Sequence, residues 1–349
     1  MLRERWRSGS GESSDGIPRG PGGKSAPTKT SYEPIRDFGS TMAAEIVFIV
    51  NPASANGRMR RRWKTYERAF RRELGPGFAV RTTDRAGHAT HHTRAALGDG
   101  ATTIVSVGGD GTFNEVVNGY LGHRETARNA DACLAVFSVG TGADFVRTLP
   151  VPATPAALAR CIRERQPQTI DAGLCEFLDA GTRRKRYFVN VAEFGSGGAV
   201  VDRVNRSSKI LGGRLTFVFA ILRTLPRYRN THVVYEADGG PSKEVVVNDF
   251  VVANGRYFGA GLMPAPAADL ADGLLDVVIF GDIDFKVARR NLPALRRGEH
   301  VSLAEVTTFR CREVTIHAAE EMIDLDGECI GRHPLRFSVV PNAVSILAE

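Results

Sequence analysis

Two short glycine-rich segments of the chain have the residue types of phosphate-binding turns. The first consists of Gly108, Gly109, Asp110, Gly111 and Thr112, between the strand-like run 105–107 and a helical pattern that begins at Phe113. Glycine allows positive φ and a close approach of the backbone, so several amide N–H groups can converge on phosphate oxygens. The following helix N-terminus favours the same ligand. Asp110 then stands where it could hold a magnesium ion or its waters.

The second segment consists of Gly140, Thr141 and Gly142, followed by Ala143 and Asp144. It also follows a strand-like run, and ligands of open α/β sheets bind at the carboxyl ends of the strands. Two such turns on one edge predict one nucleotide site, although a plain strand-to-helix turn would explain either one alone. Neither segment fits the Walker pattern or the dinucleotide G-x-G-x-x-G pattern.

The elements that must position these turns alternate between strand and helix. Strands are expected at 46–50, 78–81, 103–107 and 134–137, and helices at 59–73, at 88–97 and after Pro155. This order predicts a parallel sheet with right-handed crossovers. We therefore expect an α/β domain over residues 42–167, to which the last apolar run, within 343–349, returns as a further strand.

Beyond residue 167 the pattern changes to strands with few helices. Strands are expected at 187–191, 232–236, 244–253, 275–280, 313–317 and 335–340, and helices at 211–225 and 285–295. A second, mainly antiparallel β domain over 168–342 is predicted. The helix at 211–225 is apolar between basic ends, so it either packs in this domain, which we favour, or contacts acyl chains and anionic head groups.

Composition limits the classes of partner and compartment. The net charge is +7 and the pI is 9.3, which favours acidic partners such as nucleotide phosphates or an anionic membrane surface. We predict no nucleic-acid partner, and a homodimer is left open. No signal peptide and no membrane span is recognisable, so we expect a cytoplasmic protein with peripheral membrane contact. Residues 1–41 are rich in Gly, Ser, Pro and Arg and are expected to be disordered.

Cysteine and histidine positions argue against disulfide and zinc chemistry. The five cysteines are scattered and form no C-x-x-C pair. His88, His91 and His92 lie close together without a cysteine or carboxylate at ligand spacing, so a solvated helix face is favoured over a metal site.

The ordered motifs resemble the diacylglycerol kinase catalytic family, which includes bacterial lipid kinases and sphingosine-kinase-like enzymes. The resemblance covers nearly everything after Met42. Its motifs are Asn51-Pro52-Ala53-Ser54, Thr83 before Gly87-His88-Ala89, the segments 108–119, 140–147 and 190–199, Asn254-Gly255, Gly259-Ala260-Gly261, Asp272-Gly273-Leu274 and Asp326-Gly327-Glu328. The resemblance implies a NAD kinase/diacylglycerol kinase-like nucleotide-binding domain, followed by a β-sandwich domain that holds the lipid.

The resemblance also implies the roles of individual residues. ATP would be bound by Asn51, Ser54, Thr83, the loop from Gly108 to Thr112 and Gly140, Thr141 and Gly142. Asp110 would organise Mg²⁺ through waters, and Asp326 would accept the proton of the lipid hydroxyl. Asp272, the carbonyl of Leu274 and Asp269 would form a structural magnesium site. The family usually has Asn where this chain has Ala143, so one contact of the loop or nucleotide is in doubt.

An ATP- and Mg²⁺-dependent kinase for a diacylglycerol-like lipid is the function predicted. A NAD kinase is the alternative enzyme, because related enzymes carry similar Gly-Gly-Asp-Gly loops. A nucleotide- or lipid-binding regulator with weak activity is the non-enzymatic alternative, which Ala143 alone supports.

Overall fold

A computed structural model describes residues 44–126, 132–139, 143–179, 181–206, 224, 226, 228–318, 323–330 and 332–349. The predicted tail 1–41, the turn Gly140, Thr141 and Gly142, and nearly all of the predicted helix 211–225 lie outside these residues. Among the described residues, ten strands form one sheet and six form another.

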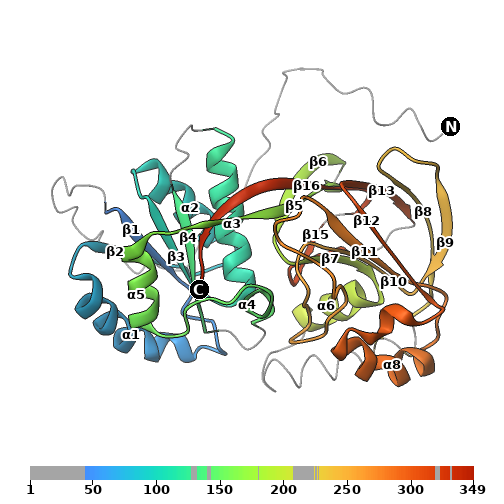
Figure 1. Ribbon diagram of the computed structural model, residues 1–349, viewed down its shortest axis with the longest axis horizontal. Coiled ribbons are helices and arrows are strands. Elements are labelled where there is room, and N and C mark those ends of the chain that lie inside the picture. Colours follow the sequence, from blue (N-terminus) through green and yellow to red (C-terminus); the bar gives the residue numbers. More distant parts are fainter. Residues whose placement is uncertain are drawn as a thin grey trace, which may run out of the picture. The chain divides into compact units, whose positions relative to one another are not determined.

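The first part of the chain alternates between strands and helices (Figure 1). Its elements are β1 (Ile46–Val50), α1 (Arg58–Leu74), β2 (Phe78–Thr82), α2 (His88–Gly98), β3 (Thr103–Gly108), α3 (Asp110–Arg124), β4 (Cys133–Ser138), α4 (Phe145–Thr148) and α5 (Pro155–Glu164). The strands lie in the order β2-β1-β3-β4 and are parallel. Parallel strands are buried on both faces, which is why they are continuous apolar runs in the sequence.

Helices cover both faces of this parallel sheet. On one face, Phe48 and Val105 pack with Phe70 of α1 and Leu158 of α5. On the other face, Ile49 and Ile104 pack with residues of α2 and α3, including Phe113 and Tyr120. Because these strands are parallel, their carboxyl ends lie at one edge of the sheet. The predicted phosphate loop, which follows β3, lies at this edge.

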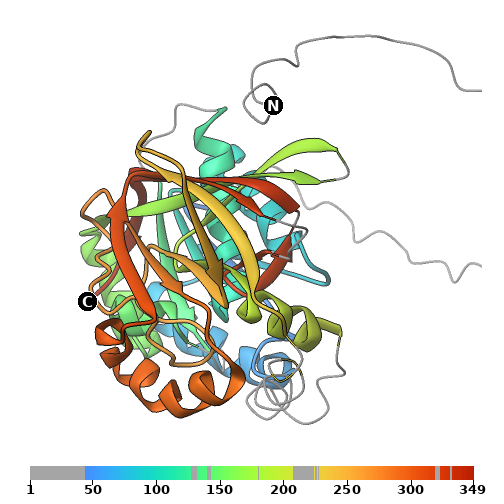
Figure 2. The ribbon, with the colours of Figure 1, turned by 90° about the vertical axis from the view of Figure 1, so that its right-hand side faces the viewer.

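The second part consists mainly of antiparallel strands. Its elements are β5 (Gln168–Asp179), β6 (Thr182–Phe188), β7 (Val191–Gly195), α6 (Ser196–Arg206), β8 (Thr231–Ala237), β9 (Lys243–Val247), β10 (Asp249–Ala253), β11 (Leu275–Phe280), α8 (Phe285–Arg297), the short 3₁₀ helix η4 (Glu299–Ser302), β12 (Val306–Cys311), β13 (Glu313–Ala318), β14 (Ile323–Leu325), β15 (Glu328–Ile330) and β16 (Arg332–Leu347). The six-stranded sheet has the order β12-β11-β10-β7-β14-β15. Figure 2 looks onto this part, with α8 at one end of the sheets.

The two sheets of the second part enclose a common apolar core. Phe194 and Phe250 from the six-stranded sheet meet Phe188, Val314 and Phe337 from the other sheet there. β5 and β16 pair with each other along most of their length and run from this sandwich into the α/β part (Figure 1). At its end β16 pairs in parallel with β4, through Ile346 and Leu347. The predicted fold class, a nucleotide-binding α/β part and a mainly antiparallel β-sandwich, is confirmed.

Three predicted boundaries are wrong, and each error has a local cause. The helix after the phosphate loop begins at Asp110 and not at Phe113, because Gly111 and Thr112 form its first turn. The expected strand 187–191 spans the end of β6 and the start of β7, since the backbone amides between them bind a side chain instead of a strand. The expected strand 244–253 is divided at Asn248, whose side chain donates a hydrogen bond to Asn230.

Candidate active site

A cleft of about 1380 Å³ lies between the α/β part and the β-sandwich. Its lining includes the following residues predicted for the site: Asn51, Ser54, Thr83, Gly109, Asp110, Gly111, Thr112 and Asp326. The fold thus brings together most of the predicted residues. Gly108 lies beneath this surface, and Gly140, Thr141 and Gly142 fall outside the described residues.

The start of α3 has the geometry of an anion-binding helix N-terminus. The first amides of a helix have no intrahelical acceptor and point outward along its axis. Asn51, directly after β1, donates a 2.9 Å hydrogen bond from Nδ2 to Thr112 Oγ1 and so fixes the first turn of α3. A Cβ at Gly108 would lie 2.5 Å from that same hydroxyl oxygen, so only glycine fits there.

Two carboxylates, Asp110 and Asp144, lie side by side in the cleft. Asp110 accepts 3.2 Å hydrogen bonds from the amides of Asp144 and Phe145. Burial raises the pKa of Asp144 to about 6; the amide of Ala260, which donates to it, opposes this shift, and the charge of Asp110 adds to it. Asp144 Oδ1 is buried and has no hydrogen-bond partner among the described residues. Hard oxygen ligands of this kind suit Mg²⁺.

Asp326 occupies the turn between β14 and β15, with a φ of 50°. Its carboxylate accepts four hydrogen bonds, from Asn114 Nδ2 (2.8 Å) and from the amides of Val189 (3.0 Å), Asn190 (3.1 Å) and Val191 (2.9 Å). Burial raises the pKa of Asp326, and these hydrogen bonds oppose the shift. A carboxylate has about four lone-pair positions, so these four donors fill the acceptor capacity of Asp326. Because Asn114 belongs to the α/β part and the three amides belong to the sandwich, this side chain also joins the two parts of the chain.

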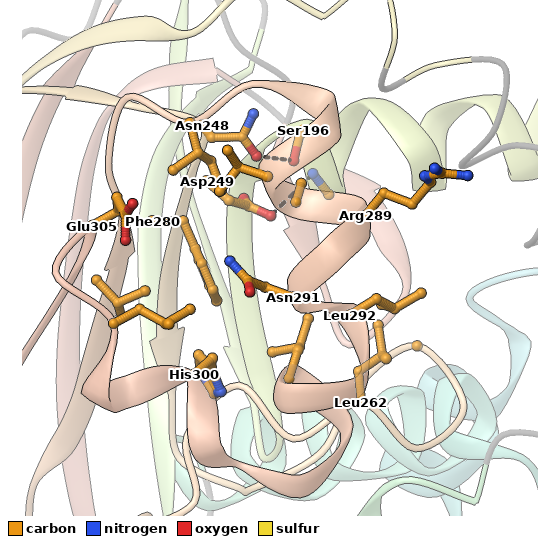
Figure 3. Close-up of a pocket in the computed structure, with 18 of the residues that line it drawn as sticks. Ser196, Asn248, Asp249, Leu262, Phe280, Arg289, Asn291, Leu292, His300 and Glu305 are labelled. Atoms are coloured by element: carbon orange, nitrogen blue, oxygen red, sulfur yellow. Dashed lines mark hydrogen bonds between the residues drawn. The ribbon is translucent and has the colours of Figure 1, made fainter.

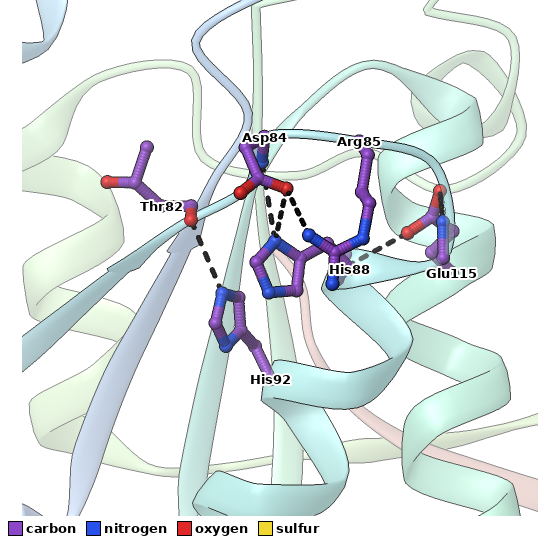
Figure 4. Close-up of polar contacts among 8 residues, drawn as sticks. Thr82, Asp84, Arg85, His88, His92 and Glu115 are labelled. Carbon is purple, nitrogen blue, oxygen red and sulfur yellow. Dashed lines mark hydrogen bonds and ion pairs between the residues drawn. The ribbon is translucent and has the colours of Figure 1, made fainter. Parts of the chain in front are cut away.

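The segment that follows β2 forms another wall of the cleft. Figure 4 shows the polar contacts of Asp84, His88, His92 and Glu115 in and beside this segment. Glu115 of α3 accepts hydrogen bonds from the amides of Gly87 and Ala89, which caps α2 with a carboxylate. The His88 ring stacks on His92 at 4.0 Å, and its Nδ1 lies 2.9 Å from Asp84 Oδ1. Burial, and then the neighbouring His88, lower the pKa of His92. The described residues contain no group of three or more His, Cys, Asp or Glu arranged to hold a metal ion.

The residues predicted for a structural magnesium site lie in one loop after β10. Asp272 forms an ion pair with Arg310 and accepts a hydrogen bond from the amide of Leu274. Asp269 accepts a hydrogen bond from the amide of Ala271. The Arg310 guanidinium also lies 3.5 Å from Asp276, so a magnesium ion here would compete with this cation.

A second, apolar pocket of about 230 Å³ adjoins the cleft beneath α8 (Figure 3). Its apolar lining comprises Val200, Phe258, Leu262, Phe280, Ile283, Phe285, Val287, Ala288, Leu292, Leu295, Leu303 and Val306. None of the residues of α8 is fully buried, because its apolar side borders this cavity. Burial lowers the pKa of His300, which stacks on Phe280, so the lining contains a neutral imidazole. Three residues, Glu193, Phe258 and Gly259, line both the pocket and the cleft.

The pocket and two of the carboxylates near it, Glu193 and Asp324, were not predicted from the sequence. Both are buried, and they lie opposite each other in the pairing of β7 with β14. The signal was present for Glu193, which interrupts the apolar run of β7, and a buried charged residue needs an explanation. The pocket gave no comparable signal, since the apolar side of α8 is typical of any amphipathic helix.

Comparisons with known proteins cover both parts of the chain. Residues 45–175 match the family described as diacylglycerol kinase catalytic domain, and residues 190–348 match the YegS C-terminal NAD kinase beta sandwich-like domain. A diacylglycerol kinase of Mycobacterium tuberculosis is 31% identical over 263 residues, which are 74% of this chain and 81% of that protein. A probable lipid kinase YegS-like protein of Pseudomonas aeruginosa is 31% identical over 80% of this chain and 87% of its own length.

A solved structure shares the fold. A diacylglycerol kinase from Bacillus anthracis superimposes with a TM-score of 0.63 and 20% sequence identity, over 89% of this chain and 98% of that chain. The shared fold therefore extends across both the α/β part and the sandwich.

Proposed function

We propose that this chain, which belongs to the diacylglycerol kinase family, transfers the γ-phosphate of ATP to the hydroxyl group of a diacylglycerol-like lipid. Its membership confirms the resemblance carried by the motifs. The observation that carries the proposal is the junction of two cavities: the cleft that contains Asp110 and Asp326 shares Glu193, Phe258 and Gly259 with the apolar pocket. A polar nucleotide and an apolar lipid can meet at such a junction.

The nucleotide would bind with its phosphates at the N-terminus of α3. Phosphoryl transfer depends on positioning and on neutralising the phosphate charge. The outward-pointing amides at the start of α3 and the side chains of Asn51 and Thr112 suit the first task. Asp110 and Asp144 would hold Mg²⁺, which supplies positive charge to the phosphates when bound.

Asp326 is our candidate for the group that accepts the proton of the lipid hydroxyl. A carboxylate whose pKa is raised by burial is a better base than an exposed one. Because four donors occupy its lone pairs, one of them must withdraw before a hydroxyl can bind. Asn114 is the donor that belongs to the α/β part, so a small movement of that part would release Asp326.

The acyl chain would lie in the apolar pocket, and α8 would face the membrane. Five basic residues of α8 are exposed: Lys286, Arg289, Arg290, Arg296 and Arg297. Basic residues near a membrane surface are attracted to anionic lipids. No helix among the described residues is long and apolar enough to cross a bilayer. We infer peripheral contact through α8 at the mouth of the pocket.

The function is tested by transfer of labelled γ-phosphate from ATP to a total lipid extract with Mg²⁺, followed by identification of the labelled product. We expect a phosphorylated lipid alcohol, and Asp110→Asn should lower its formation at least about 100-fold. Formation of NADP from NAD, or ATP binding without any labelled lipid, would contradict the proposal.

A further inference from the structure

Glu193 lies at the place where the apolar pocket opens into the nucleotide cleft. Its neighbours in β7, Ala192 and Phe194, belong to the core between the sheets. Side chains alternate along a strand, so Glu193 points to the opposite face of the sheet, toward the two cavities. Its side chain is only 2% exposed.

The carboxyl group of Glu193 is closely surrounded by protein atoms, but its hydrogen-bonding capacity is not filled. A Cβ at Gly197 would lie 2.5 Å from this carboxyl group, so glycine at that position makes the space that it occupies. Oε2 is buried and has no hydrogen-bond partner among the described residues. An unsatisfied buried polar atom destabilises the folded protein, and a ligand that supplies the missing partner recovers that free energy.

The surroundings of Glu193 determine its charge. Asp324 lies opposite it on β14, and Asp249 lies nearby on β10, where it accepts a hydrogen bond from the amide of Gly197. Burial, Asp249 and Asp324 raise the pKa of Glu193 well above its usual range. A protonated carboxyl group has one donor and further acceptor capacity, which matches an uncharged alcohol or ester.

We propose that Glu193 recognises the head group of the lipid: its carboxyl group hydrogen-bonds an uncharged alcohol head whose acyl chain lies in the pocket, and it helps to exclude lipids with an anionic head group. This inference rests on the proposed function. A head group that carries a phosphate would lose water at this buried carboxyl group without gaining a cation from it, whereas an uncharged alcohol needs only a hydrogen bond. Ser196 and Asn248 lie at the same end of the pocket as Asp249 (Figure 3). Ser196 Oγ donates a 2.9 Å hydrogen bond to Asn248 Oδ1.

The test compares the wild-type protein with Glu193→Gln and Glu193→Leu, using dioleoylglycerol, phosphatidylglycerol and a long-chain amino alcohol in mixed micelles. The matched control is Glu244→Leu, an exposed residue of β9. We expect wild-type kcat/KM for dioleoylglycerol to exceed that for phosphatidylglycerol at least about tenfold. Glu193→Gln, which keeps a donor and an acceptor, should stay within about threefold of wild type, and Glu193→Leu should lose at least about tenfold, mainly through KM.

Separate outcomes identify which idea fails. Affinity for ATP, measured by calorimetry, should be unchanged in both Glu193 variants. If the wild-type protein phosphorylates none of the lipids, the proposed function fails and this inference with it. If it phosphorylates lipids but prefers phosphatidylglycerol or the amino alcohol, or if Glu193→Leu matches wild type, only the role of Glu193 is overturned. Should Glu193→Leu not fold, the wild-type preference and Glu193→Gln decide the question.

Discussion

Asn114 donates a 2.8 Å hydrogen bond from Nδ2 to Oδ2 of Asp326, which lies 212 positions further along the chain. Asn114 is fully buried on α3, and its amide also binds the carbonyl oxygen of Tyr187. The other three donors to Asp326 that we find are backbone amides of the sandwich part. This contact therefore couples the helix that follows the phosphate loop to the proposed catalytic carboxylate.

Replacing Asn114 with alanine should change the pH dependence of catalysis. The hydrogen bond from Asn114 lowers the pKa of Asp326, and Asp326 must be ionised to accept a proton. Asn114→Ala should therefore shift the acid limb of the kcat/KM profile to higher pH. It should also lower the free energy of unfolding by about 1–3 kcal/mol, measured in urea.

Asn118→Ala is the matched control, because Asn118 binds Tyr187 and Asn114 but not Asp326. It should destabilise the protein without moving the acid limb. The same acid limb in both variants and in the wild type would show that Asp326 is not the base.

Asp144 should make the protein less stable as the pH rises. Its pKa is raised to about 6 in the folded protein, against 3.8 as its ordinary value. The folded state thus holds a proton that the unfolded state has lost, and stability falls as the pH rises from about 4 through 6. Each pKa unit is worth about 1.36 kcal/mol, so Asp144→Asn should gain up to about 3 kcal/mol relative to wild type at pH 7.5.

At pH 3.5 this advantage should disappear, because Asp144 is then largely protonated in both states. Urea unfolding at the two pH values measures the difference. An equal effect of Asp144→Asn at both values would contradict the raised pKa.

Ala143 has a left-handed backbone conformation, with a φ of 55°. Such a conformation is unfavourable for alanine, whereas asparagine tolerates it. This gives a physical reason for the asparagine that the family usually has there. Ala143→Asn should raise the free energy of unfolding by about 0.5–1 kcal/mol.

The control for this change is Ala156→Asn on α5, an exposed helical position where asparagine is a poorer helix former than alanine. It should not raise stability. A melting temperature of Ala143→Asn at or below that of wild type would show that backbone strain at this position is not relieved by asparagine.

Much of the fold was predictable because burial leaves a strong pattern. The run at β1 is apolar on both faces and identifies a parallel strand. The helix expected after Pro155 is confirmed as α5, and the Ala157 amide donates a hydrogen bond to Thr154 at its start. The fold brings Asp110 and Asp326 into one cleft, although their exact roles stay predictions. The roles expected for Asp110 and Asp326 rest on the ordered motifs of the sequence, and not on the periodicity of its apolar residues.

What could not be predicted depends on contacts distant in sequence. The break between β6 and β7 exists because Val189, Asn190 and Val191 bind Asp326, and nothing near them in the sequence indicates that partner. Likewise, Glu193 becomes meaningful only when the pairing of β7 with β14 places it beside Asp324. Strand patterns give the faces of a sheet but not which strands pair.

The proposed function depends on the apolar pocket being the place of the lipid chain, and Leu292→Trp tests this most directly. Leu292 of α8 lines the pocket but not the cleft (Figure 3), so a larger side chain there should fill the space for the chain. With labelled ATP and dioleoylglycerol, we predict phosphate transfer by the wild type and a loss of at least about tenfold in kcat/KM in Leu292→Trp, with unchanged affinity for ATP. Equal transfer by the two proteins would contradict the account.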